Sequence, residues 1–215
     1  MRIGVLVSGA GTNLQALLDA EQAGTLAPAM IACVISSRPG AVAIDRAHAA
    51  GKPAVTIDPR DHARDTWEGL LTDELERHGA RAVVLAGFMR LLGPRFLAGF
   101  PDRVINTHPA LLPAFPGLDA CGQAIAYGVK VSGCTVHFVD SGIDSGPIIA
   151  QRAVLVAPGD TALTLQARIQ VEEHRLLPVV VRALAAGTLR CRGRIVEIDG
   201  AADSLAAAAA CPGSD

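Results

Sequence analysis

The sequence predicts an α/β fold built on one mixed sheet, parallel in its N-terminal half and completed by an antiparallel pair. In the first half of the 215-residue chain, short runs rich in Val, Ile and Leu alternate with amphipathic helical segments. This alternation is typical of parallel βαβ units with right-handed crossovers. In the second half, two strand-like runs are separated only by the short loop Asp140–Gly146, which favours an antiparallel pair.

The individual elements follow from local patterns. Continuous apolar runs indicate buried strands, and apolar residues at helical spacing, such as Trp67, Leu71 and Leu75, indicate helices. Strands are expected at 2–7, 30–35, 53–57, 82–86, 131–139, 147–156 and 190–198, with a further one ending at 104–105. Helices are expected at 14–23, 41–50, 61–78 and 122–128, and from Asp160 or Thr161 to Ala186.

Composition and charge exclude several classes of protein. The net charge is −2, aromatic residues make up 3%, and no basic block is present, so we expect no nucleic-acid partner. No apolar run reaches the roughly 18 residues of a membrane span, and the start does not resemble a signal peptide. Five scattered cysteines suit free thiols and a cytoplasmic location. One domain is expected over 1–200, followed by a disordered Ala-rich tail at 201–215.

The stretch Val104–Gly117 is the main candidate for a catalytic site. Asn106 and His108 follow an apolar run and are two residues apart, so in extended backbone their side chains project to the same side. An amide that stabilises an oxyanion beside an imidazole that moves a proton suits acyl-group chemistry. A turn with a surface histidine would look the same, and these two residues alone leave both interpretations open.

Two other segments could join this stretch. The turn containing Gly9 and Gly11 follows the first strand and opens a helix, which favours a phosphate. It is no dinucleotide fingerprint, because Leu14 stands where a third glycine is needed. An ordinary turn capped by Thr12 is the alternative. Asp144, in a glycine-flanked loop, would stabilise a protonated His108, although an aspartate there is also a common turn residue. We interpret His137 as a core histidine.

Taken together, the motifs resemble the phosphoribosylglycinamide formyltransferases, the folate-dependent transformylases of purine synthesis. The resemblance extends over about residues 1–198 and implies a Rossmann-like, three-layer formyltransferase fold. It also implies 10-formyltetrahydrofolate as co-substrate, only small-molecule substrates, and a monomer or homodimer. The motifs that carry it are Ser8–Gln15, Leu85–Leu92, Asn106–Pro113 and the loop Val136–Gly146.

The histidines never cluster with metal-ligand spacing, so we expect no metal. The resemblance implies roles for individual residues. The catalytic residues would be Asn106, His108 and Asp144. The residues that hold the phosphoribosylglycinamide would be Gly11, Thr12 and Asn13, at its phosphate, and Glu173. The residues that hold the folate would be Arg64, Met89, Arg90, Leu91, Leu92, Asn106, Val139, Asp140 and Asp144. Ala114 and Cys121 depart from the family, in which lysine and histidine are common at these positions.

The chemistry can also be argued without the resemblance. An amine attacks a formyl carbon carried on N10 of the folate, and negative charge develops on oxygen. Asn106 and a protonated His108 would donate to that oxygen, and one such donor lowers the barrier by about 3 kcal/mol. Asp144 would relay a proton through water. Two alternatives are a formyltetrahydrofolate hydrolase, a family with an extra N-terminal domain, and a non-catalytic phosphate-binding module.

Overall fold

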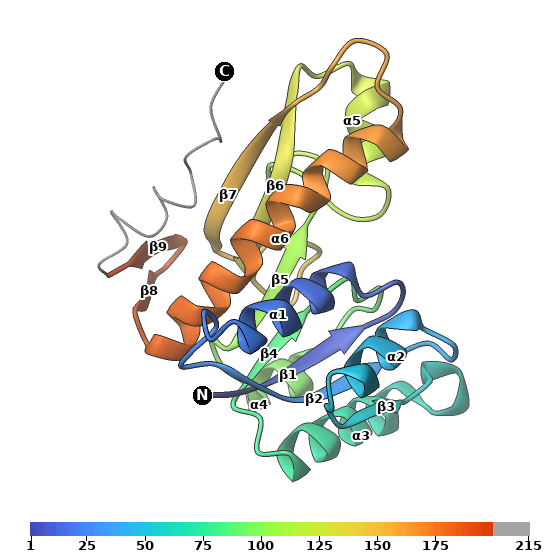
Figure 1. The fold of residues 1–215 in the computed structure, drawn as a ribbon, viewed down its shortest axis with the longest axis vertical. Helices are drawn as coiled ribbons and strands as arrows, with labels where there is room; N and C mark the ends of the chain where they lie inside the picture. The colour runs from blue at the N-terminus through green and yellow to red at the C-terminus, as the bar shows by residue number, and fades with distance from the viewer. Residues whose placement is uncertain (200–215) are drawn as a thin grey trace.

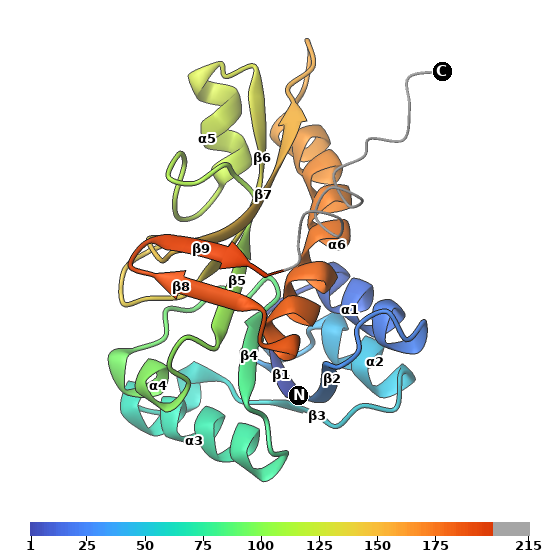
Figure 2. The same ribbon diagram turned by 90° about the vertical axis from the view of Figure 1, so that its left-hand side faces the viewer.

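The computed structural model describes residues 1–199 and shows a seven-stranded sheet with helices on both faces (Figures 1 and 2). The strand order is β3-β2-β1-β4-β5-β6-β7. The first five strands pair in parallel and the last two are antiparallel, so the predicted mixed sheet is confirmed. The expected tail at 201–215 lies outside the described residues. The strands are β1 (Arg2–Val7), β2 (Met30–Ser36), β3 (Ala54–Thr56), β4 (Ala82–Leu85), β5 (Val104–His108), β6 (Val131–Phe138) and β7 (Ile148–Leu155).

The helices form one layer on each face of the sheet. Helices α1 (Thr12–Gln22), α2 (Val42–Ala49), α5 (Ala120–Tyr127) and α6 (Ala162–Ala186) pack on one face. Helices α3 (Arg64–Arg77) and α4 (Pro94–Gly99) pack on the other. No helix within residues 1–199 has the length and apolar character needed to cross a membrane.

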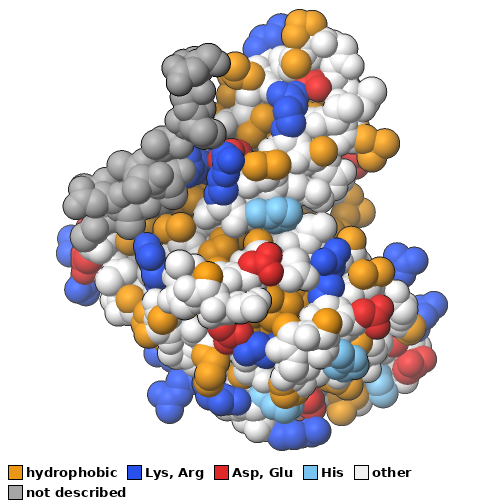
Figure 3. Space-filling model, in the orientation of Figure 1, with side chains coloured by type: hydrophobic (Ala, Val, Ile, Leu, Met, Phe, Trp, Pro, Cys, Tyr) orange, Lys and Arg blue, Asp and Glu red, His pale blue; other side chains and the backbone are white. Residues whose placement is uncertain are grey.

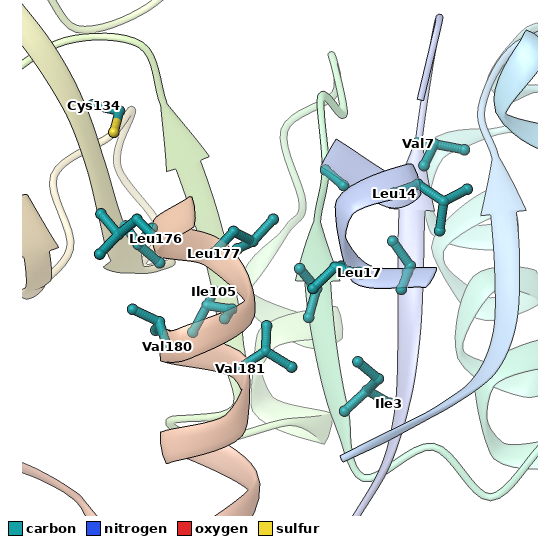
Figure 4. Packing of buried hydrophobic residues seen from close by; sticks show 14 of the residues in the cluster. Ile3, Val7, Leu14, Leu17, Ile105, Cys134, Leu176, Leu177, Val180 and Val181 are labelled. Atoms are coloured by element: carbon teal, nitrogen blue, oxygen red, sulfur yellow. The ribbon is translucent and has the colours of Figure 1, made fainter. Parts of the chain in front are cut away.

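The larger core lies between the sheet and the pair α1 and α6. Figure 4 shows Leu176, Leu177, Val180 and Val181 of α6 beside Ile105 of β5, while Leu14 and Leu17 of α1 lie near β1. All of these side chains are completely buried. Val104 packs in the core on the opposite face, so β5 alternates between the two layers as a central strand must.

Several local expectations differ from the structure. The strand expected at 190–198 is wrong: these residues form a hairpin of β8 (Leu189–Arg192) and β9 (Ile195–Ile198), turned at Gly193, whose φ is 64°. Helix α4 was not predicted, because its six residues are too few to show a helical period. Helix α3 begins at Arg64 because the 3-10 turn Pro59–Asp61 precedes it. Helix α5 begins at Ala120, two residues earlier than expected.

The helix caps also decide where α6 begins and whether Thr12 caps α1. Thr161 caps α6 through its hydroxyl, which accepts the N–H of Thr164 in a reciprocal capping box. Helix α1, in contrast, has no side-chain cap: its N-cap is Gly11, with φ 72°, and Thr12 is the first helical residue. The interpretation of a turn capped by Thr12 is therefore wrong.

Hydrogen bonds join the loops at the carboxyl ends of the strands. The hydroxyls of Ser8, after β1, and Ser37, after β2, lie 2.7 Å apart and are buried. Ser8 Oγ also accepts the backbone N–H of Met89, in the loop after β4, at 2.9 Å. The turn after β1 and the loop 86–93 are thus fixed relative to each other at the sheet edge where ligands of open α/β sheets bind.

Candidate active site

The three residues expected to act together lie together beyond the end of β5. Asn106 Nδ2 donates to Asp144 Oδ1 at 3.4 Å, and His108 Nδ1 lies 3.3 Å from Asp144 Oδ2. His108 is 5% exposed. Asn106 and His108 project from the same side of the strand, as their spacing predicts, and Thr107 between them faces α6 instead. The structure therefore brings an amide, an imidazole and a carboxylate into one small cluster.

Both ring nitrogens of His108 face acceptors. Nδ1 faces the Asp144 carboxylate, and Nε2 lies 2.8 Å from the carbonyl oxygen of Phe115. A neutral imidazole carries only one N–H, so it would leave one of these acceptors facing a lone pair. A ring N–H of His108 at this position could stabilise negative charge on a substrate oxygen.

Asp144 is held in an unusual backbone conformation by its loop. Its φ is 48°, in the left-handed region that non-glycine residues seldom adopt. Asp140 Oδ1 fixes this loop by accepting from the Gly142 N–H at 3.0 Å and the Ser145 hydroxyl at 2.7 Å. Gly146 is required because a Cβ there would lie 1.8 Å from the Phe138 carbonyl oxygen. The loop therefore presents the Asp144 carboxylate to β5 in one fixed position.

The surroundings of Asp144 favour its ionised form. Burial raises the pKa of this carboxyl, but hydrogen bonds from His137 and from the Gly117 N–H, with the positive charge of the nearby histidines, outweigh burial and hold its pKa below 3.8. The Gly117 N–H donates to Oδ2 at 2.8 Å. Asp144 is therefore a carboxylate near neutral pH, and its negative charge faces the His108 ring.

His137 belongs to this cluster, which sequence reasoning missed. It pairs directly across from Asn106 in the β5–β6 register, and its Nε2 lies 3.2 Å from Asn106 Nδ2 and 3.7 Å from Asp144 Oδ1. It is 2% exposed, so the expectation of a core histidine is correct but incomplete. Its Nδ1 donates to the Phe138 carbonyl oxygen at 2.8 Å, and its Nε2 faces both the Asn106 amide and the Asp144 carboxylate. Only the strand register could have identified this partner.

Glu173 connects the first glycine turn to β5. Its Oε2 accepts from Asn13 Nδ2 and its Oε1 from the Thr107 hydroxyl, both at 3.2 Å. Burial raises the pKa of Glu173, and these two hydrogen bonds offset only part of that effect. Asn13 Oδ1 is buried without a hydrogen-bond partner among the described residues. Glu173 is thus an interior group beneath the turn and not part of a solvated helix face.

The residues expected to hold folate lie at the start of α3 and in the segments that follow β4 and β6. Met89 and Leu91 are 62% and 59% exposed, whereas Leu92 is buried. Val139 packs partly buried against the core that contains Trp67 and Phe88. The Arg64 side chain, at the start of α3, lies 3.1 Å from Glu68 and 3.5 Å from the Leu91 carbonyl oxygen. Arg64 and the loop 89–92 therefore lie together, as the resemblance implies. Cys121 is buried in α5, outside the trio.

Two hollows on the surface of the described residues are lined by none of the trio. The larger, of about 560 Å³, lies between α1 and α6 and includes Thr12, Arg46 and Arg182. Figure 3 shows this face of the molecule, where charged and histidine side chains lie among apolar ones. The smaller, of about 350 Å³, is lined by Arg38, Arg60 and Arg90 with other residues. Within residues 1–199, no group of three or more His, Cys, Asp or Glu side chains could hold a metal ion.

Fold and cluster together define an α/β enzyme for acyl transfer, and comparison with known proteins specifies the acyl group. A family model described as "Formyl transferase" matches residues 1–181, so the chain belongs to the formyl transferase family. Within that family, it is 47% identical over 194 residues to a phosphoribosylglycinamide formyltransferase of Mycobacterium tuberculosis, covering 90% of this chain and 89% of the relative.

Two further relatives support the same assignment. The crystal structure of glycinamide ribonucleotide transformylase 1 from Symbiobacterium toebii superposes with a TM-score of 0.90 at 50% identity, covering 92% of this chain and 93% of that one. The human trifunctional purine biosynthetic protein adenosine-3 is 40% identical over 190 residues, covering 88% of this chain and 19% of its own length. The predicted class, a formyltransferase of purine biosynthesis, is confirmed.

Proposed function

We propose that this enzyme transfers the formyl group of 10-formyltetrahydrofolate to the amine of 5'-phosphoribosylglycinamide. The observation that carries the proposal is the cluster at the end of β5, in which Asn106 and His108 each lie within 3.4 Å of the Asp144 carboxylate. The printed names of the relatives support this acceptor. We propose that the protein is cytoplasmic and works as a monomer or homodimer on small molecules alone.

In the proposed reaction, the substrate amine attacks the formyl carbon and a tetrahedral species forms with negative charge on oxygen. Asn106 Nδ2 and a ring N–H of His108 donate to that oxygen. His108 Nε2 donates to the Phe115 carbonyl oxygen at 2.8 Å, so the formyl oxygen would replace this acceptor. His108 is buried and Asn106 is half-buried, and one well-placed donor of this kind lowers the barrier by about 3 kcal/mol.

The proton balance assigns a role to Asp144. The attacking amine loses a proton, and the folate nitrogen gains one when its bond to the formyl carbon breaks. A carboxylate with a lowered pKa is a weak base, so we assign Asp144 to stabilising the imidazolium and orienting a water that carries the proton. No covalent intermediate with the enzyme is needed.

The two ligands would occupy different parts of the crevice. The Gly11–Asn13 turn offers N–H groups at the start of α1 to the phosphate, with Glu173 below it. The folate would lie across Arg64, the loop 89–92, and the segment containing Val139 and Asp140.

One assay separates the proposal from its alternatives. Purified protein is mixed with 10-formyltetrahydrofolate, with or without the ribonucleotide, and release of tetrahydrofolate is followed. We expect release only when the ribonucleotide is present. Release without it would make the protein a hydrolase, and no release in either mixture would make it a binding module.

A further inference from the structure

Glu68 is a buried carboxylate that the reaction scheme does not use. It lies on α3, four residues after Arg64, and is 5% exposed. Its Oε1 accepts from Arg64 Nε at 3.1 Å and from the backbone N–H of Gly93 at 2.8 Å. One oxygen atom therefore joins the arginine on α3 to the loop that follows β4.

A side chain at Gly93 would crowd the Glu68 carboxylate. A Cβ there would lie 2.8 Å and 3.0 Å from the two oxygens of Glu68, although the φ of −81° at Gly93 suits any side chain. A side chain at Gly93 would therefore displace the Glu68 carboxylate without straining the backbone. This loop also carries Leu91, whose carbonyl oxygen lies 3.5 Å from Arg64 Nη2.

The contacts of Glu68 add little to the free energy of unfolding. The Arg64 side chain is 61% exposed, and an exposed ion pair at this helical spacing adds little to folding. Burying a carboxylate is costly unless it is well hydrogen-bonded. The arrangement has a clear effect on geometry, however: it limits the guanidinium to one orientation and leaves its remaining N–H groups exposed beside the loop 89–92.

We infer that Glu68 is a positioning residue for the folate site, holding Arg64 and the loop 89–93 in register for the anionic part of the donor. The inference rests on the proposed function, which places the folate on Arg64 and this loop. It adds a residue that does not itself touch the donor. Because both contacts are made to Oε1, the position of this oxygen matters more than the charge.

The test compares Glu68→Gln with Glu68→Met. Glutamine keeps an acceptor oxygen for both N–H groups, whereas methionine keeps the volume and removes both contacts. We expect Glu68→Met to raise the KM for 10-formyltetrahydrofolate about tenfold, with kcat and the KM for the ribonucleotide within about twofold of wild type. Glu68→Gln should stay within about threefold for all three constants.

Glu74 provides a matched control on the same helix. It is 9% exposed and contacts Arg77 at 3.0 Å and His78 at 3.1 Å, away from the loop 89–93. Glu74→Met should lower the melting temperature without changing the donor KM. If Glu68→Met behaved in the same way, Glu68 would be only structural and the inference would be overturned. Should Glu68→Met fail to fold, Gly93→Ala displaces the carboxylate with one methyl group, and an unchanged donor KM would overturn it equally.

The variant Arg64→Ala tests the assignment of folate to Arg64 separately from the role of Glu68. A raised donor KM in Arg64→Ala with an unchanged one in Glu68→Met overturns the role of Glu68 and leaves the folate site standing. An unchanged donor KM in Arg64→Ala overturns the assignment of folate to Arg64, and the role of Glu68 with it.

Discussion

The glycine turn after β1 allows a prediction whose size can be worked out from the structure. Gly11 has φ 72°, and its added Cβ would lie 2.7 Å from Ala43 Cβ and 2.8 Å from Ala43 Cα on α2. A left-handed conformation costs a non-glycine residue about 1–2 kcal/mol. Overpacking of this kind costs about 1–3 kcal/mol. We therefore expect Gly11→Ala to lower the free energy of unfolding by about 2–5 kcal/mol.

Gly9 is the matched control in the same turn. A Cβ at Gly9 meets nothing within 4 Å and its φ is unremarkable. Gly9→Ala should therefore change stability by less than about 0.5 kcal/mol. Urea unfolding can be followed by the fluorescence of Trp67, the single tryptophan, which is 3% exposed. Equal losses in the two variants, or a Gly11→Ala variant as stable as wild type, would refute the steric reasoning.

The same variant also bears on the phosphate site. If enough folded protein remains, Gly11→Ala should raise the KM for the ribonucleotide and leave the KM for the folate unchanged. A bulkier change such as Gly11→Val would confound folding with binding, because Ala43 leaves no space for it. The structure thus makes alanine the informative substitution at this position.

Three further predictions concern the cluster and its surroundings. His108→Ala or Asp144→Asn should lower turnover by about two orders of magnitude or more while both ligands still bind in calorimetry; near-normal turnover in both would remove them from the mechanism. The lowered pKa of Asp144 stabilises the fold above pH 3.8, and this contribution disappears as pH falls through the folded pKa; Asp144→Asn should flatten the acid limb of stability measured by urea unfolding. The raised pKa of Glu173 has the opposite sign, so stability should decline as pH rises from 4.5 through the folded pKa, and a Glu173→Gln variant that kept this decline would contradict the assignment.

The parts of the fold that depend on local pattern could be predicted from the sequence. Apolar runs of strand length, helical periodicity and the short Asp140–Gly146 loop were enough for the mixed sheet. Strand geometry also explains why Asn106 and His108 could be placed on one side, since alternation is a property of extended backbone alone. Short elements could not be predicted in this way. The six residues of α4 and the four-residue strands of the hairpin at Gly193 are too short to show a helical or strand periodicity.

Tertiary structure decided the partners of these residues. His137 reaches Asn106 only through the β5–β6 register, and Asn13 bonds Glu173 across 160 positions of the chain because α1 and α6 pack side by side. A helical glutamate is solvated by default, and only packing against α1 and β5 buries it and raises its pKa. Sequence by itself thus determined which groups lie at the strand ends. Packing determined which of them touch and which are charged, because both depend on distances and burial between segments far apart in the chain.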